Sequence, residues 1–153
     1  MLHDCLETVL SQYARYDAAF SRRDERALAV IETSDFIDTD PDGTRRNAAQ
    51  AAENQLRFFS IAEHLNLRST VQCESPHDGE MHTVARMSLD GAYTPPNSHR
   101  HDFSEVYINH DVWRNVNGTW RLASQTTVRL DGVDDGRPVH LILKSSKREM
   151  QSS

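Results

Sequence analysis

The stretch "SDFIDTDPDG", residues 34–43, holds four aspartates close together: Asp35, Asp38, Asp40 and Asp42. A carboxylate that points into a partly dry interior can act as a general base, whereas carboxylates in turns face water. Asp42 precedes a glycine, which favours a turn, and Asp35 stands at the start of a short strand pattern. Asp38 and Asp40 share a strand face with Phe36 if the extended conformation continues. Pro41 favours that conformation at Asp40.

Three amphipathic helices are expected before and just after this stretch. The first covers residues 2–21, where apolar side chains recur at steps of three and four: Leu2, Leu6, Val9, Tyr13, Tyr16 and Phe20. A short second helix follows Asp24, a suitable N-cap, and buries Leu28 and Ile31. The third covers residues 45–61, with its apolar side formed by Ala48, Ala52, Leu56 and Phe59.

The rest of the chain has the pattern of strands. A short strand at 36–39 precedes the third helix, and alternating segments follow it at 65–74, 81–89, 103–116, 119–130 and 139–143. Asn117-Gly118 joins two of them and suits a type I′ turn. Turns are also expected at 90–91 and at "DGVDDGRP", residues 131–138. The order predicts an α+β fold, with three N-terminal helices packed on a curved, mostly antiparallel sheet. A bent sheet closed by helices leaves a cavity for a ligand.

Length and charge narrow the possible functions. The 153 residues favour one domain over 1–144, followed by a disordered tail at 145–153. A net charge of −6 argues against a nucleic-acid partner, and no apolar run approaches a membrane span. The N-terminus lacks the pattern of a signal peptide. Cys5 and Cys73 form no disulfide framework, so we expect two buried or half-buried thiols and a cytoplasmic location.

Three stretches together resemble the nuclear transport factor 2-like superfamily, which includes SnoaL-like polyketide cyclases and ketosteroid isomerases. "YARYDAAFSRRDERAL" looks like the first helix and helix-turn of that superfamily, and "DFIDTDPDGT" looks like its first strand and turn. "HDVWRNVNGTWRLASQ" looks like its terminal hairpin. The resemblance implies a cone-shaped, cystatin-like fold. It specifies the activity poorly, because this superfamily hosts enzymes, binding modules and assembly domains.

The resemblance to ketosteroid isomerase implies three catalytic residues. That enzyme has an "ARY" triplet whose tyrosine donates to the substrate oxygen, which corresponds to Tyr16. Its catalytic Asp-Pro corresponds to Asp40-Pro41, and the aspartate of its "DV-x-R" stretch corresponds to Asp111. The implied roles are Asp40 as base, with Tyr16 and Asp111 donating hydrogen bonds to the developing oxyanion. In the alternative interpretation the three residues are structural: Tyr16 packs in the core, Asp40 caps a turn and Asp111 stabilises the hairpin.

The expected pocket is more polar than a steroid would need. Period-two alternation places Asp111 on one strand face with Tyr107, Asn109 and Trp113, and the register implied by the resemblance adds Ala123, Gln125 and Thr127 from the facing strand. The residues expected to bind substrate are Tyr13, Leu56, Phe59, Tyr107, Asn109, Trp113, Gln125 and Thr127.

The favoured function is therefore acid–base isomerisation or cyclisation next to a carbonyl, with no metal and no organic cofactor. The alternative is a non-catalytic ligand-binding or dimerisation module on the same fold. Convergence of Tyr16, Asp40 and Asp111 in one cavity would favour the enzyme.

The histidines and the outer face of the 103–116 strand carry two further patterns. His99, His101 and His110 could form a metal site, but the first two follow a loop pattern expected to be exposed, so none is predicted. A related dehydratase uses pocket histidines, whereas His110 should face away from the pocket. The face that carries His110 also holds Val106, Ile108 and Val112. This face is too apolar for water alone, and the resemblance implies that it pairs two subunits in a homodimer.

Overall fold

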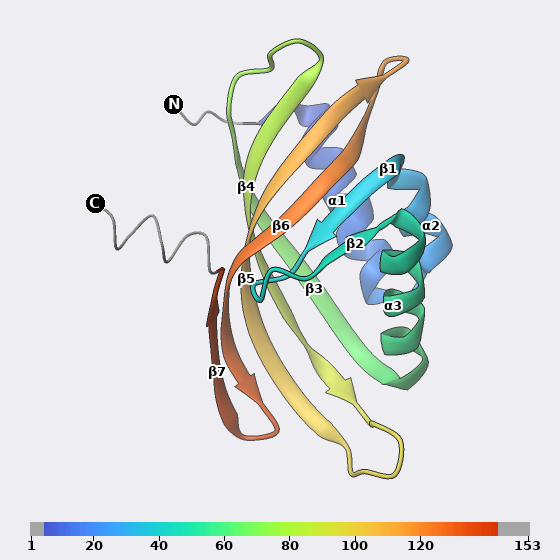
Figure 1. Ribbon diagram of the computed structural model, residues 1–153, viewed down its shortest axis with the longest axis vertical. Helices are drawn as coiled ribbons and strands as arrows, with labels where there is room; N and C mark the ends of the chain where they lie inside the picture. Colours follow the sequence, from blue (N-terminus) through green and yellow to red (C-terminus); the bar gives the residue numbers. More distant parts are fainter. Residues whose placement is uncertain (1–4, 144–153) are drawn as a thin grey trace, which may run out of the picture.

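The computed structural model describes residues 5–143 as three helices and a seven-stranded sheet. The three helices lie on one side of the long, curved strands (Figure 1). This arrangement confirms the predicted α+β class. The tail predicted at 145–153 lies outside the described residues. No helix in the described part of the chain has the length and hydropathy needed to cross a membrane.

Two of the three helices begin where a capping side chain accepts from a first-turn amide, whereas α1 begins without a side-chain cap. Helix α1 spans Glu7–Ser21 and buries Val9, Tyr13 and Tyr16, as the apolar stripe predicted. Helix α2 spans Glu25–Ile31, and its first turn donates from the Ala27 amide to the Asp24 carboxylate at 3.0 Å. Helix α3 spans Ala48–Ile61 behind a capping box formed by Asn47 and Gln50. It begins three residues later than predicted because Arg45–Asn47 forms the short strand β2.

The sheet has the order β2-β1-β6-β5-β4-β3, with β7 paired to the far half of β6. Strand β1 runs parallel to β6, and every other neighbouring pair is antiparallel. The remaining strands are β1 (Glu32–Thr39), β3 (Ala62–Cys73), β4 (Glu80–Tyr93), β5 (His101–Val116), β6 (Thr119–Asp134) and β7 (Arg137–Ile142).

Two glycines that suggested turns instead lie inside long strands. Strand β4 continues through Gly91 to Tyr93, and β6 continues through Gly132 to Asp134. A Cβ atom at Gly91 would lie 2.9 Å from Cδ2 of Leu65, and one at Gly132 would lie 2.2 Å from the Ser104 carbonyl oxygen. Both glycines are therefore required by the close approach of a neighbouring strand. The expected turn at Asn117-Gly118 is present, with φ of +52° and +88°.

The inner and outer faces of β5 follow the predicted alternation. Asn109, Asp111 and Trp113 are buried on the face that the helices cover. Val106, Ile108 and Val112 are half-buried on the opposite face, where His110 is exposed, which confirms that His110 points away from the interior.

The two cysteines are joined, which corrects the prediction of separate thiols. A disulfide links Cys5, just before α1, to Cys73 at the end of β3, with their Cα atoms 5.0 Å apart. Disulfides persist in oxidising compartments, so the cysteines give no support to the cytoplasmic location expected from them.

Reduction of this disulfide should destabilise the fold. The bond closes a loop across 68 positions of sequence, and such a cross-link stabilises a protein by roughly 2–4 kcal/mol. We expect a reductant to lower the free energy of unfolding by that amount in urea titrations. A Cys5→Ser/Cys73→Ser variant serves as the control and should not respond to the reductant. Equal unfolding curves for the native chain with and without reductant would contradict the linkage.

Candidate functional site

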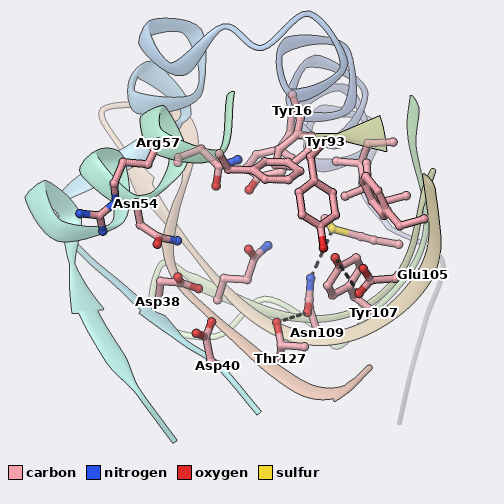
Figure 2. A pocket seen from close by; sticks show the side chains of 18 of the residues that line it. Tyr16, Asp38, Asp40, Asn54, Arg57, Tyr93, Glu105, Tyr107, Asn109 and Thr127 are labelled. Carbon is pink, nitrogen blue, oxygen red and sulfur yellow. Dashed lines mark hydrogen bonds between the residues drawn. The ribbon is translucent and has the colours of Figure 1, made fainter. Parts of the chain in front are cut away.

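A cavity of about 560 Å³ lies between the helices and the inner face of the sheet. Its volume is typical of sites that enclose a small organic molecule. Helices α1 and α3 line one side, and strands β1, β3, β4, β5 and β6 contribute to the others. In Figure 2, Tyr16 lies on the helix side of the cavity, with Asp38, Asp40, Asn109 and Thr127 across from it on the sheet side.

One part of the cavity wall is aromatic. The rings of Phe58, Tyr93 and Phe103 pack against one another with centroids 5.7–6.2 Å apart, and Phe20 contacts Phe58 at 6.4 Å. Leu67 and Met87 extend this apolar surface. A ligand therefore has an apolar wall on which a ring or hydrocarbon body can pack.

Tyr16 reaches the cavity and is buried as a whole, with 9% of its surface exposed. Its pKa is raised well above the ordinary tyrosine value, first by burial and then by the negative charges of Glu32 and Asp38. The hydroxyl therefore stays protonated and can donate a hydrogen bond to a ligand.

Asp38 is the carboxyl group of this cavity with the clearest sign of burial. It extends from β1, and its side chain is 21% exposed. Burial, reinforced by the charge of Asp40, raises its pKa to about 6 although Arg46 opposes the shift. The carboxyl is therefore mostly ionised at pH 7 but more basic than an ordinary aspartate.

Asp40 also lines the cavity but is held by a strong ion pair. Its carboxylate accepts a hydrogen bond from Nη1 of Arg46 at 2.7 Å, whereas Asp38 lies 3.5 Å from the same nitrogen. The Asp40 side chain is 37% exposed. Arg46 comes from β2, which pairs with β1 opposite Asp38. Strand β2, which was not predicted, thus determines how the environments of Asp38 and Asp40 differ.

Asp111 is buried behind the cavity wall and does not line it. The side chain is 1% exposed and accepts a hydrogen bond from the Tyr13 hydroxyl at 2.5 Å. That hydroxyl also lies 2.6 Å from Oγ1 of Thr83 and accepts from Nε1 of Trp113 at 3.1 Å. Burial raises the pKa of Asp111 to about 7, although the hydrogen bond from Tyr13 lowers it in part. The structure therefore brings Tyr16 and Asp40 to the cavity, while Asp111 joins Tyr13.

Gln125 connects the buried acid with the cavity. It is the cross-strand neighbour of Asp111, and its side chain lines the cavity. The amide lowers the pKa of Asp111, yet Nε2 of Gln125 and Oδ1 of Asp111 are both buried without a full hydrogen bond among the described residues. A buried donor without a partner is costly, and a ligand oxygen could satisfy it.

The other predicted binding residues divide into two sets. Tyr107, Asn109 and Thr127 line the cavity, and Thr127 orients Asn109 by donating to its Oδ1 at 2.8 Å. The remaining four do not line it: Tyr13 and Trp113 are buried in the Asp111 network, Phe59 packs in the core against Phe20, and Leu56 is 56% exposed.

Several cavity residues were missed by the sequence reasoning. Gln55 and Phe58 show that α3 faces the cavity about one position away from the stripe assumed for Leu56 and Phe59. Glu105 lies on the same alternating face of β5 as Tyr107, so the period of two could have identified it. Asp134 comes from the part of β6 that the sequence indicated as a turn.

The buried acid at position 111 should make stability depend on pH. Its pKa is about 7 in the folded state, against about 3.9 for an unfolded aspartate, so the carboxyl group favours folding most below pH 4 and this contribution is lost as pH rises towards 7. Asp111→Asn keeps an acceptor for Tyr13 but cannot ionise. The free energy of unfolding in urea titrations is the quantity to measure. Between pH 4 and pH 8, the variant's value should rise relative to that of the native chain by on the order of 3 kcal/mol. A constant difference across this range would contradict the assignment.

The fold matches solved structures, although no protein-family model and no curated sequence matches the chain. A scytalone dehydratase-type protein from Novosphingobium aromaticivorans superimposes with a TM-score of 0.67 at 12% identity, covering 88% of this chain and 89% of that one. A ketosteroid isomerase-like protein from Erwinia carotovora atroseptica gives 0.63 at 17% identity, covering 80% and 93%. A nuclear transport factor 2-like dehydratase family member from Streptomyces avermitilis gives 0.63 at 14%, covering 79% and 93%. These likenesses confirm the predicted fold.

Proposed function

We propose that this nuclear transport factor 2-like fold encloses a catalytic small-molecule cavity, in which acid–base chemistry isomerises or cyclises a carbonyl compound. The observation that supports the proposal most directly is Asp38, a carboxylate of raised pKa that lies across the cavity from the buried Tyr16. A base with a pKa near neutrality and a donor for the substrate oxygen are the two groups that this chemistry requires.

In the proposed reaction, the Asp38 carboxylate accepts a proton from the carbon next to the carbonyl group. The electron pair of the broken C–H bond moves towards the carbonyl oxygen, where the Tyr16 hydroxyl and the Gln125 amide would donate hydrogen bonds. Protonated Asp38 then returns the proton to a different carbon, which completes an isomerisation. For a cyclisation, the same enolate carbon forms a bond to a second carbonyl carbon of the substrate, and Asp38 gives the proton to the resulting alkoxide. Neither route requires a metal or an organic cofactor.

The surrounding acids would not oppose this charge strongly at neutral pH. Glu32 lies near Tyr16, and burial raises its pKa to about 8, so it is mostly protonated at pH 7. Burial likewise raises the pKa of Asp111 to about 7, so about half of this carboxyl group is neutral at pH 7. A carboxyl group in its neutral form adds no repulsion to a nearby oxyanion.

In this proposal Asp40 and Asp111 act indirectly. The predicted base, Asp40, draws Arg46 towards itself, which limits how strongly Arg46 can lower the pKa of Asp38. Asp111 holds Tyr13 and influences Gln125 from behind the wall. We therefore assign Asp38 the role of base, and Asp40 and Asp111 the roles of positioning groups.

Non-catalytic ligand binding in the same cavity is the second candidate. It is favoured by the burial of Asp111, which leaves only two of the three acid and tyrosine groups predicted for catalysis inside the cavity. A binding protein needs the aromatic wall and the polar donors, but it needs no group that transfers protons.

Asp38→Asn and Asp40→Asn separate these candidates, because each replaces one carboxylate by an amide of the same size. The assay follows hydrogen exchange next to the carbonyl of a bound cyclic ketone by proton NMR in deuterated water. We expect Asp38→Asn to slow this exchange by roughly 100-fold or more. Asp40→Asn should retain exchange within about tenfold.

Ketones for this assay are first selected by their stabilisation of the native chain in a thermal-shift screen, and both variants must keep that stabilisation. If no ketone that binds exchanges faster than it does in buffer, the chain is a binding protein. If Asp40→Asn abolishes exchange and Asp38→Asn does not, the assignment of the base is wrong.

We also propose that the outer face of β4 and β5 pairs two copies of the chain. Val84 of β4 pairs with His110 and is therefore diagonal to the half-buried Ile108 and Val112 of β5. Val106 extends this apolar row along β5, in the middle of an otherwise polar face. The position of Ile108 is flanked by Arg86 on β4 and Arg129 on β6.

Sedimentation velocity at micromolar concentration should show a dimer that Ile108→Asp converts to a monomer. The new carboxylate would meet two flanking arginines, so the variant should still fold, while the apolar contact between copies would be lost. Val30→Asp is the matched control, because Val30 is 67% exposed on α2 and should leave the dimer unchanged. A native chain that sediments as a monomer would overturn the proposal.

A further inference from the structure

A cluster of metal-binding side chains lies at one end of the sheet, outside the cavity. His99 and His101 come from the loop after β4 and the start of β5, and Asp135 comes from the turn between β6 and β7. Both connections lie at the same end of the long strands (Figure 1). The Asp135 amide donates to the Asp102 carbonyl oxygen at 2.9 Å, which joins the two segments.

The distances within the cluster are close to those of a metal site. Nε2 of His99 and Nε2 of His101 lie 2.8 Å and 3.9 Å from Oδ2 of Asp135, and one ligand atom from each residue lies within 4.8 Å of the others. Tetrahedral zinc with bonds of about 2.0–2.1 Å places its ligand atoms roughly 3.3 Å apart. Small side-chain movements would therefore suffice to bind an ion, and no change of the backbone is required.

The hydrogen bonds around His101 leave the correct nitrogen free for a metal. Tyr93 donates its single hydroxyl proton to Asp134 at 2.7 Å, so the contact of 3.1 Å between Tyr93 and Nδ1 of His101 requires Nδ1 to donate. In neutral His101, Nε2 then carries a lone pair that faces the Asp135 carboxylate. Two acceptors that face each other favour a cation between them. The hydroxyl of Ser98 also lies near this nitrogen, at a long 3.5 Å.

The surroundings of the cluster leave it accessible to a metal ion. Arg100 lies next to both histidines in sequence, but it pairs with Glu63 and Asp102 at 3.2 Å. The side chain of His99 is 69% exposed, which gives an ion a path from solvent.

We propose that His99, His101 and Asp135 form a binding site for a divalent transition-metal ion, with zinc as the best fit and water as the fourth ligand. Two imidazoles and one carboxylate suit zinc and exclude magnesium and calcium, which prefer oxygen ligands. Tyr93 orients His101 in the way that outer ligands orient metal-binding histidines elsewhere. Tyr93 and Asp134 also line the cavity, so a bound ion would order the adjoining part of its wall.

The test is calorimetric titration of tag-free protein with zinc chloride, with magnesium chloride as a negative control. We expect one zinc ion per chain and a raised midpoint of thermal unfolding. His99→Ala and His101→Ala should each weaken zinc binding at least tenfold. Asp135→Asn should also weaken it while retaining the turn, because Asn tolerates the positive φ of +53° found there.

Two exposed histidines beside carboxylates supply matched controls. His77 lies 3.1 Å from Asp78, and His82 lies 3.8 Å from Glu80. His77→Ala and His82→Ala should leave zinc binding unchanged. Absence of stoichiometric zinc binding, or equal binding by the native chain and the His99→Ala and His101→Ala variants, would overturn the proposal. Losses of equal size in the control variants would also overturn it, because zinc would then bind exposed histidines in general.

Discussion

The hydrogen bond between Tyr13 and the buried carboxyl group of Asp111 is the interaction on which the cavity depends. It joins α1 to the middle of β5, and the same tyrosine hydroxyl contacts Thr83 of β4 and Trp113 of β5. Loss of a partner would leave a buried carboxyl group without a donor, which is costly in a dry interior. Because α1 is fixed at Tyr13, Tyr16 lies nearly one turn further along the helix, on the cavity wall. The buried hydrogen bonds of Tyr13 thus position the part of the cavity wall that Tyr16 forms.

This division also separates the roles of the acidic side chains. Asp111 is inaccessible and holds the structure, Asp40 is engaged by Arg46, and Asp38 remains to face the cavity with a raised pKa. The three carboxyl groups are chemically identical and differ only in burial and in the nearest donor. Their environments, and not their residue types, therefore determine which of them is suited to accept a proton.

Much of the fold could be predicted because local signals agreed. The apolar stripe of α1, the Asp24 cap, the Asn117-Gly118 turn and the alternation of β5 depend on neighbours in the sequence, and the structure contains each of them. The resemblance of three stretches to a known superfamily added the cone-shaped arrangement of helices on a curved, mostly antiparallel sheet. The parallel pairing of β1 with β6 was not predicted, because no local pattern indicates it.

The candidate site was harder to predict because it depends on contacts between distant segments. Tyr13 and Tyr16 lie on one helix stripe, and only the packing of α1 decides which of them meets Asp111. Asp38 and Asp40 share a strand face, and Arg46 on the unpredicted strand β2 distinguishes them. The Cys5–Cys73 disulfide and the approach of Asp135 to two histidines also join residues far apart in the chain. No local pattern specifies such pairs.

The proposed chemistry depends on Asp38 being a base of raised pKa inside the cavity. It is tested most directly by titrating the carboxyl carbons of the ¹³C-labelled protein by NMR, with the Asp38→Asn variant used to assign the resonance. The Asp38 signal should titrate with a pKa of about 6. A midpoint at or below the ordinary aspartate value of about 3.9 would contradict it, since the carboxylate would then be no better a base than one in water.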